Sequence, residues 1–235
     1  MLRKKFRTAT KGAKWWRLEI DRKTNLISLV AFLLSIASVA SQAYFFFQGP
    51  RISLQPPDMV VFYKGEQGVD GRSYLKMSSR MTYVNSGQPG FNDAVSKEYA
   101  IVDVGGKMYL LFWKDFVSTD AIEKKLVVQK KEDAAPVVVM AGSAVTHETS
   151  FTPTYTPLKN NKPGANFLEF SEFERLASAA AAINVTLGYE TFSGLKGGVK
   201  CSLVVDARFK DYLRNGWANP TCSRVSEWFE HFEPK

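Results

Sequence analysis

The sequence predicts a mostly β domain that is preceded by a single transmembrane helix near the N-terminus. Residues 51–235 contain about seven to nine short runs of β-branched and aromatic residues, separated by Gly- and Pro-containing turns. An uncharged apolar run lies before them. We expect an Ig-like β-sandwich, with a small β-barrel as the alternative, and one or two short helices within the domain.

The apolar run extends from Leu26 to Phe47 and holds 22 residues without a charge. A helix rises ~1.5 Å per residue, so the run would span ~33 Å, enough to cross a hydrocarbon core of ~30 Å. Gly49 and Pro50 follow it and favour an end to the helix. This length and composition indicate a transmembrane helix.

We interpret residues 25–48 as a retained signal anchor. A cleaved signal peptide is the alternative, because Ser38–Ala40 and Ser41–Ala43 both place small residues at the spacing that cleavage needs. The long basic segment before the run and the apolar residues after both sites favour the anchor.

Most of the net charge of +8 lies before the apolar run. Residues 1–24 contain two acids, Glu19 and Asp21, and nine basic residues: Arg3, Lys4, Lys5, Arg7, Lys11, Lys14, Arg17, Arg22 and Lys23. The remainder is nearly neutral, which argues against nucleic acid as a partner. Basic residues beside a transmembrane helix stay on the cytoplasmic side. The expected topology is therefore a cytoplasmic tail, residues 1–24, and an extracytoplasmic domain, residues 51–235, in the periplasm or outside the cell.

Two features of the N-terminal part indicate membrane contacts. Basic and tryptophan side chains next to the helix favour contact with lipid headgroups, and these are Lys14, Trp15, Trp16, Arg17, Arg22 and Lys23. Small and polar residues recur along one stripe of the helix at spacings of three and four, namely Ser28, Ala31, Ser35, Ser38 and Gln42. Such a stripe favours packing against a second transmembrane helix, from another membrane protein or a second copy. Isolated Ser and Ala residues are also tolerated in lipid, with hydroxyls bonded to their own helix.

The only two cysteines, Cys201 and Cys222, lie in the expected outer domain. An oxidising compartment favours a disulfide between them. Two cysteines with two distant histidines are too few for a convincing zinc site.

Local patterns within residues 51–235 predict particular elements. Gly105-Gly106 between two β-rich runs predicts a hairpin. Residues 171–182 are rich in helix formers, and Ser171 with Glu174 has the spacing of a capping box, so we expect a helix there. Residues 209–215 predict a helical turn that Gly216 ends.

Few residues suggest chemistry. His147 is followed by Glu148, but the second histidine of a zinc-protease motif is absent, and His231 stands alone. No phosphate-binding loop or nucleophile elbow is present. We therefore predict neither an enzyme nor a bound cofactor or metal.

The sequence favours a non-catalytic interaction or complex-assembly module that is anchored in the lipid bilayer by one span. Two alternatives stay open. One is an extracytoplasmic sensor of a small ligand. The other is a membrane effector of a signalling or defence system with a cytoplasmic β domain, in which case both cysteines would be free thiols.

Overall fold

A computed structural model of the chain describes residues 24–68, 70–122, 125–153 and 167–228. The chain divides into two compact units, Met1–Gln48 and Gly49–Lys235. The first contains helix α1, Thr24–Gln48, and its segment Ile27–Tyr44 is long and apolar enough to cross a membrane. None of that segment is buried within its own unit. The expected apolar helix is therefore present, and its passage through a membrane stays a prediction.

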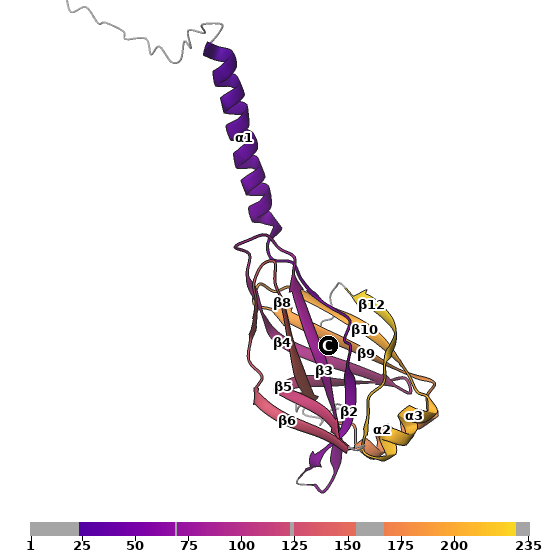
Figure 1. The fold of residues 1–235 in the computed structure, drawn as a ribbon. Coiled ribbons are helices and arrows are strands. Elements are labelled where there is room, and N and C mark those ends of the chain that lie inside the picture. Colours follow the sequence, from indigo (N-terminus) through magenta and orange to yellow (C-terminus); the bar gives the residue numbers. More distant parts are fainter. Residues whose placement is uncertain (1–23, 69, 123–124, 154–166, 229–235) are drawn as a thin grey trace, which may run out of the picture. The chain divides into compact units, whose positions relative to one another are not determined.

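The second unit is built around one antiparallel sheet of 12 strands (Figure 1). Their bounds are β1 Ile52–Leu54, β2 Val60–Gln67, β3 Ser73–Asn85, β4 Asp93–Val104, β5 Lys107–Ile122, β6 Lys125–Asp133, β7 Val137–Val139, β8 Ala144–Thr152, β9 Ala182–Thr191, β10 Lys196–Val204, β11 Trp217–Ala218 and β12 Cys222–Trp228. The main order is β11-β2-β3-β8-β5-β4-β9-β10-β12, while β1 pairs with β3, β6 with β5 and β7 with β4. The mostly β class is confirmed, since strands make up 54% of the residues that the structure describes.

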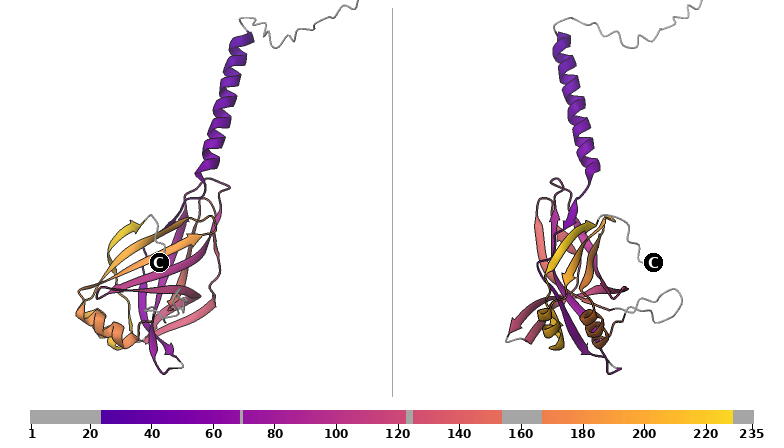
Figure 2. Two further views of the ribbon diagram at one scale, coloured as in Figure 1. Left: turned by 180° about the vertical axis from the view of Figure 1, so that it is seen from behind. Right: turned by 90° about the vertical axis from the view of Figure 1, so that its right-hand side faces the viewer.

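The Ig-like β-sandwich is not confirmed, because the strands form one curled sheet, a half-barrel, rather than two facing sheets (Figure 2). The alternating pattern that predicted strands is the same in a sandwich and in a curled sheet. What separates the two folds is the pairing between distant strands, for example β4 with β9, and local sequence does not carry that information.

The curl brings distant strands into contact across the concave side. Tyr83 on β3 and Tyr189 on β9 have ring centroids 5.3 Å apart, although three strands separate them in the sheet. A flat sheet would place β3 and β9 ~19 Å apart. The Tyr189 hydroxyl also donates to the carbonyl oxygen of Ile52. The concave side is therefore a filled core and not a channel.

A buried carboxylate lies at the centre of this core. Glu98 on β4 is fully buried and accepts hydrogen bonds from the Tyr83 hydroxyl (3.0 Å) and the Thr149 hydroxyl (2.7 Å). His147 Nε2 lies 2.6 Å from Glu98 Oε1. The partners come from β3 and β8, so this one side chain connects both walls of the curled sheet.

Two short helices cover one end of the half-barrel (Figures 1 and 2). They are α2, Phe170–Ala179, and α3, Ala207–Arg214. Phe173 of α2 and Phe209 of α3 both pack on Phe62 of β2, at centroid distances of 5.0 and 6.5 Å. Burial of these aromatic rings holds the helices against the sheet.

The helix predictions hold in position but fail in one detail. The predicted capping box is wrong, because α2 begins at Phe170 and Ser171 lies within it, after the N-cap Glu169. The second helix is capped by Asp206, whose side chain accepts from the Phe209 N–H at 2.7 Å. The hairpin at Gly105-Gly106 is confirmed, with φ values of 61° and 76° that glycine adopts without strain.

The opposite end of the half-barrel is organised by Asn85, the last residue of β3. Its fully buried amide donates to the carbonyl oxygens of Phe91 (2.9 Å) and Val139 (3.1 Å). Its Oδ1 accepts from the N–H groups of Arg51 (3.3 Å) and Gly87 (2.9 Å). One side chain thus joins the first residues of the domain to the loop after β3 and to β7.

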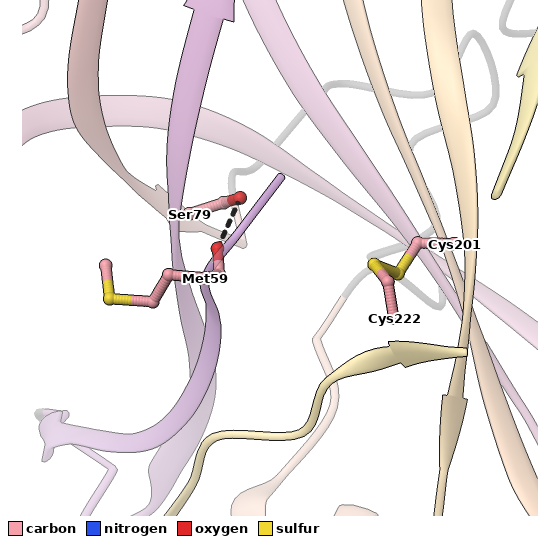
Figure 3. The surroundings of a disulfide bond; sticks show 4 residues. All are labelled: Met59, Ser79, Cys201 and Cys222. Atoms are coloured by element: carbon pink, nitrogen blue, oxygen red, sulfur yellow. Dashed lines mark hydrogen bonds between the residues drawn. A yellow bond between two sulfur atoms is a disulfide. The ribbon is translucent and has the colours of Figure 1, made fainter. Parts of the chain in front are cut away.

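The structure places the two cysteines at disulfide distance (Figure 3), with their Cα atoms 5.4 Å apart. Cys201 is buried on β10, and Cys222 begins the edge strand β12. The bond therefore ties the last described strand to the core. The chain-entropy account gives a closed loop of this size ~3 kcal/mol of stabilisation.

We expect Glu98→Gln to lower the free energy of unfolding by about 2–4 kcal/mol, because the new amide NH₂ faces donors and leaves polar groups in the core unpaired. Urea unfolding of the full chain in detergent, followed by circular dichroism, measures the change. Glu190→Gln is the matched control. Its carboxylate is half-exposed and pairs with Lys97 at 3.4 Å, so its loss should cost less than ~1 kcal/mol. Equal losses in the two variants would contradict the role given to Glu98.

Candidate functional site

The second half of β5 and strand β6 form a ribbon that lies over the convex face of the sheet. Its contacts create a small second core around Val61, Tyr63 and Trp217. On β2, Val61 and Tyr63 alternate with Val60 and Phe62 of the main core, so the two clusters lie on opposite faces. The ribbon side of this small core is supplied by Leu126 and Val128 of β6.

Hydrogen bonds hold the ribbon to the sheet. Thr119 of β5 donates its N–H to Glu148 Oε2 of β8 at 3.2 Å, and its hydroxyl also bonds to that carboxylate. The Thr119 hydroxyl lies 3.2 Å from the Ser78 hydroxyl of β3. The ribbon is therefore fixed in place along its inner side.

A groove of about 880 Å³ remains between the ribbon, β2, β3 and β11. This volume lies within the range of ligand-binding sites, ~300–1,000 Å³. The residues around it are Tyr63, Lys64, Gly65, Glu66, Lys76, Lys114, Asp115, Val117, Lys125, Leu126, Val128, Lys130, Ser150, Asn215, Gly216 and Trp217.

Lysines dominate the charge of the groove, with five of them against two acids. Lys130 is neutralised in part, because it pairs with Asp115 at 2.8 Å and also with Asp133, and these contacts raise its pKa. The other four form no ion pair within the described part of the chain: Lys64, Lys76, Lys114 and Lys125. A local positive potential thus sits on a domain that is close to neutral.

A β-bulge in β2 shapes this wall of the groove. The pairing of β2 with β3 shifts register between Lys64 and Gln67. A Cβ atom on Gly65 would lie 2.9 Å from the Tyr74 carbonyl oxygen and 3.1 Å from Cε of Lys76. The glycine therefore leaves room for the aliphatic stem of Lys76 to lie against β2. Bulges commonly redirect side chains beside binding sites.

The floor of the groove is aromatic. Tyr63 and Trp217 are 9% and 7% exposed, and Trp217 packs on Tyr212 with ring centroids 4.8 Å apart. The hydroxyls of Tyr63 and Ser150 lie 2.8 Å apart. Burial raises the pKa of Tyr63 to about 12, and the acidic side chains of Asp115 and Glu148 add to the effect. Tyr63 is therefore a neutral hydrogen-bonding group at physiological pH.

One of the strands that line the groove, β6, lies at an open edge of the sheet. Strand β6 pairs with β5 alone among the described strands, so its other backbone edge offers N–H and C=O groups. Lysines on an edge strand also discourage aggregation by repulsion. Protection of the edge from aggregation explains Lys125 and Lys130 on β6. It does not explain why Lys64 of β2 and Lys76 of β3 line the same groove.

The predicted transmembrane face stays a prediction. All described side chains of α1 from residue 27 to 44 are exposed. The Ser35 hydroxyl donates to the Ala31 carbonyl oxygen at 2.8 Å, so this hydroxyl is bonded within its own helix. That leaves Gln42 as the side chain of the stripe best able to bond across a helix contact. The predicted lipid-contacting residues, Lys14 to Arg17 with Arg22 and Lys23, lie outside the described residues.

His147 has a structural environment. Its side chain is 14% exposed and contacts Glu98, and the ring packs against Tyr83 and Phe116 at centroid distances of 5.7 and 4.7 Å. It does not line the lysine-rich groove. His231 lies outside the described residues. Among those that are described, no group of three or more His, Cys, Asp or Glu side chains could hold a metal ion.

The groove was not predicted from the sequence. Its lysines come from four strands, and Lys64 and Lys130 are far apart in the chain. The available signal was weak: Leu126 and Val128 alternate with polar residues in an otherwise charged segment, which indicates a strand with one covered face.

No family model, curated protein or solved structure matches this chain.

We expect Tyr63→Phe to flatten the loss of stability at high pH. An unfolded tyrosine loses its proton near pH 10, whereas Tyr63 keeps its proton until about pH 12. The unfolded state is therefore favoured progressively between these values, and Tyr63 accounts for up to ~2–3 kcal/mol of that fall. Part of the fall persists in the variant, because burial also raises the pKa of Tyr189 to about 12.

The free energy of unfolding at several pH values from neutral to alkaline measures this effect. Ser150→Ala is the matched control, since it removes the same hydrogen bond, at ~1 kcal/mol, but keeps the tyrosine. Its alkaline fall should match that of the wild type. Equal slopes for the two variants would contradict the assignment.

Proposed function

We propose that the chain is a single-pass, membrane-anchored protein whose extracytoplasmic β domain is a non-catalytic interaction module. Its partner presents an extended acidic segment, which lies along β6 in the lysine-lined groove. The observation that carries the proposal is the convergence of four lysines without ion pairs over an aromatic floor beside an open strand edge.

The anchoring rests on α1 and on charge. The helix contains one apolar segment of spanning length, and the basic residues lie before it. The pairing of Cys201 with Cys222 supports an oxidising compartment for the domain. Both observations favour the same topology, and they are independent of each other.

The form of the groove supports an extended peptide. A free strand edge can accept another strand through main-chain hydrogen bonds, while side pockets select alternate side chains. Acidic side chains would meet Lys64, Lys76 and Lys114, and apolar ones would meet the floor at Tyr63 and Trp217. Complementary charge of this kind mainly improves specificity and the rate of association.

A second candidate is a sensor of a small anionic ligand, and the size of the groove favours it. The two functions differ in their dependence on chain length. If the groove is a small-ligand site, free glutamate should bind as tightly as an acidic peptide. If a peptide adds as a strand, tight binding requires several consecutive residues.

We expect a fluorescently labelled peptide of alternating Glu and Val to bind the full chain in detergent, and added salt to weaken binding. Fluorescence anisotropy measures the affinity. Lys64→Glu with Lys114→Glu should reduce it by roughly tenfold or more, about 1.4 kcal/mol. The control is Lys97→Glu with Lys200→Glu, which changes the net charge by the same amount at exposed sites outside the groove and should leave the affinity nearly unchanged. Equal effects of the two pairs, or no binding by the wild type, would contradict the proposal.

The topology has a direct chemical test. Protein from intact cells is denatured in the presence of an alkylating reagent, with and without prior reduction, and the mass is measured. Denaturation is needed because Cys201 is fully buried. We expect no alkylation without reductant and two modified cysteines after reduction. Two modified cysteines without reduction would favour a cytoplasmic β domain.

A further inference from the structure

The described β domain exposes few large apolar side chains, and most of them lie together. They are Met108, Val138, Met140, Phe192, Leu195 and Val204, with exposed fractions between 38% and 70%. Scattered exposed apolar residues need no explanation. Four of these six belong to one end of the sheet, and we call this set the apolar end patch: Val138, Met140, Phe192 and Leu195.

Strand pairing places the patch on one surface. Val138 of β7 pairs with Ala94 of β4, and the Phe192 N–H donates to the Ala94 carbonyl oxygen at 3.0 Å. Their neighbours Val139 and Val95 are fully buried, so the alternation turns Val138, Ala94 and Phe192 outward. They form a row across three adjacent strand segments, ~10 Å wide. Met140 directly follows β7, and Leu195 closes the turn that begins at Thr191, whose N–H donates to the Leu195 carbonyl oxygen at 2.9 Å.

The patch lies at the end where the chain enters the domain. The Asn85 amide group bonds to both the Arg51 N–H and the Val139 carbonyl oxygen. The first residues of the domain are thus linked through one side chain to the strand that carries the patch. The helices α2 and α3, with Met108 on the adjacent hairpin, occupy the other end.

Chain length then limits how far this end can be from a bilayer. Three residue steps separate Gln48, the last residue of α1, from Arg51, which is at most ~11 Å of extended chain. The apolar run fills a hydrocarbon core of ~30 Å, so Gln48 is placed at its boundary. The headgroup layer beyond that boundary is ~5–8 Å thick. The end of the domain at Arg51 therefore cannot lie far outside the headgroups.

We propose that the apolar end patch is a lipid-contacting surface, which inserts Phe192, Met140 and Val138 into the headgroup region of the bilayer that α1 anchors. The inference rests on the proposed anchoring. Apolar and aromatic side chains gain free energy at this depth, where a tethered domain reaches it without a search. Contact at a second point would also restrict rotation of the domain about its short tether.

The test uses the full chain in phosphatidylcholine vesicles that contain a headgroup-spin-labelled phospholipid. An environment-sensitive fluorophore is attached to Phe192→Cys or, as the matched control, to Met108→Cys. The two side chains have nearly equal exposure, 70% and 68%, and lie at opposite ends of the sheet. The native cysteines are paired and do not react. We expect the lipid to quench the label at 192 at least about threefold more than the label at 108.

Each outcome has a distinct meaning. Equal, weak quenching at both positions in protein that floats with the vesicles overturns the lipid contact but leaves the anchoring intact. A blue-shifted but unquenched label at 192 also overturns it, and shows that protein, such as a second copy, covers the patch. Failure of the protein to float, or its release by alkaline carbonate, overturns the anchoring and the inference together. Loss of the quenching in a Met140→Ser, Val138→Ser background would support the patch as a unit.

Discussion

The fold depends on the curl that lets Glu98 reach both walls of the sheet. Strands β3 and β4 are three steps apart in the sheet, ~14 Å if it were flat, yet Tyr83 and Glu98 are hydrogen-bonded. A buried carboxylate is costly unless donors surround it, and Tyr83, His147 and Thr149 do so. These hydrogen bonds require the sheet to curl enough to bring β3 and β8 to Glu98 on β4, so the polar cluster favours the half-barrel over a flat sheet.

The curl also gives the two ends of the domain different characters. One end is closed by aromatic packing of α2 and α3 on Phe62, which needs no polar partner. The other is closed by the hydrogen bonds of Asn85, which need accurately placed loops. The convex face is closed by neither of these contacts. There the β5–β6 ribbon folds back over Tyr63 and Trp217, and the groove is the space that this second core leaves open.

Sequence patterns predicted the features that depend on residues close together in the chain. The apolar helix, the hairpin at Gly105-Gly106 and the positions of both short helices follow from composition, backbone freedom and helix propensity. The Ig-like sandwich is not confirmed and the capping box was wrong, because the curl of the sheet and the start of α2 involve contacts between distant residues, such as Glu98 with Tyr83 and Phe173 with Phe62. The groove was missed for the same reason, since Lys64 and Lys130 become neighbours only after the ribbon folds back. Pairs of residues with large sequence separation leave no periodic signal.

The apolar end patch is proposed to contact lipid and the groove to bind a partner in water, and the two lie at different ends of the domain. The groove includes Asn215 and Gly216 next to α3, and the Lys64 N–H donates to the Gly216 carbonyl oxygen at 2.9 Å. It therefore lies toward the end of the sheet opposite Arg51 and Asn85. If lipid holds the Arg51 end, the lysines are directed into the aqueous compartment, where an acidic segment can reach them. An inverted placement would bring the lysines toward lipid headgroups and leave Phe192 in water, which the hydrophobic effect opposes.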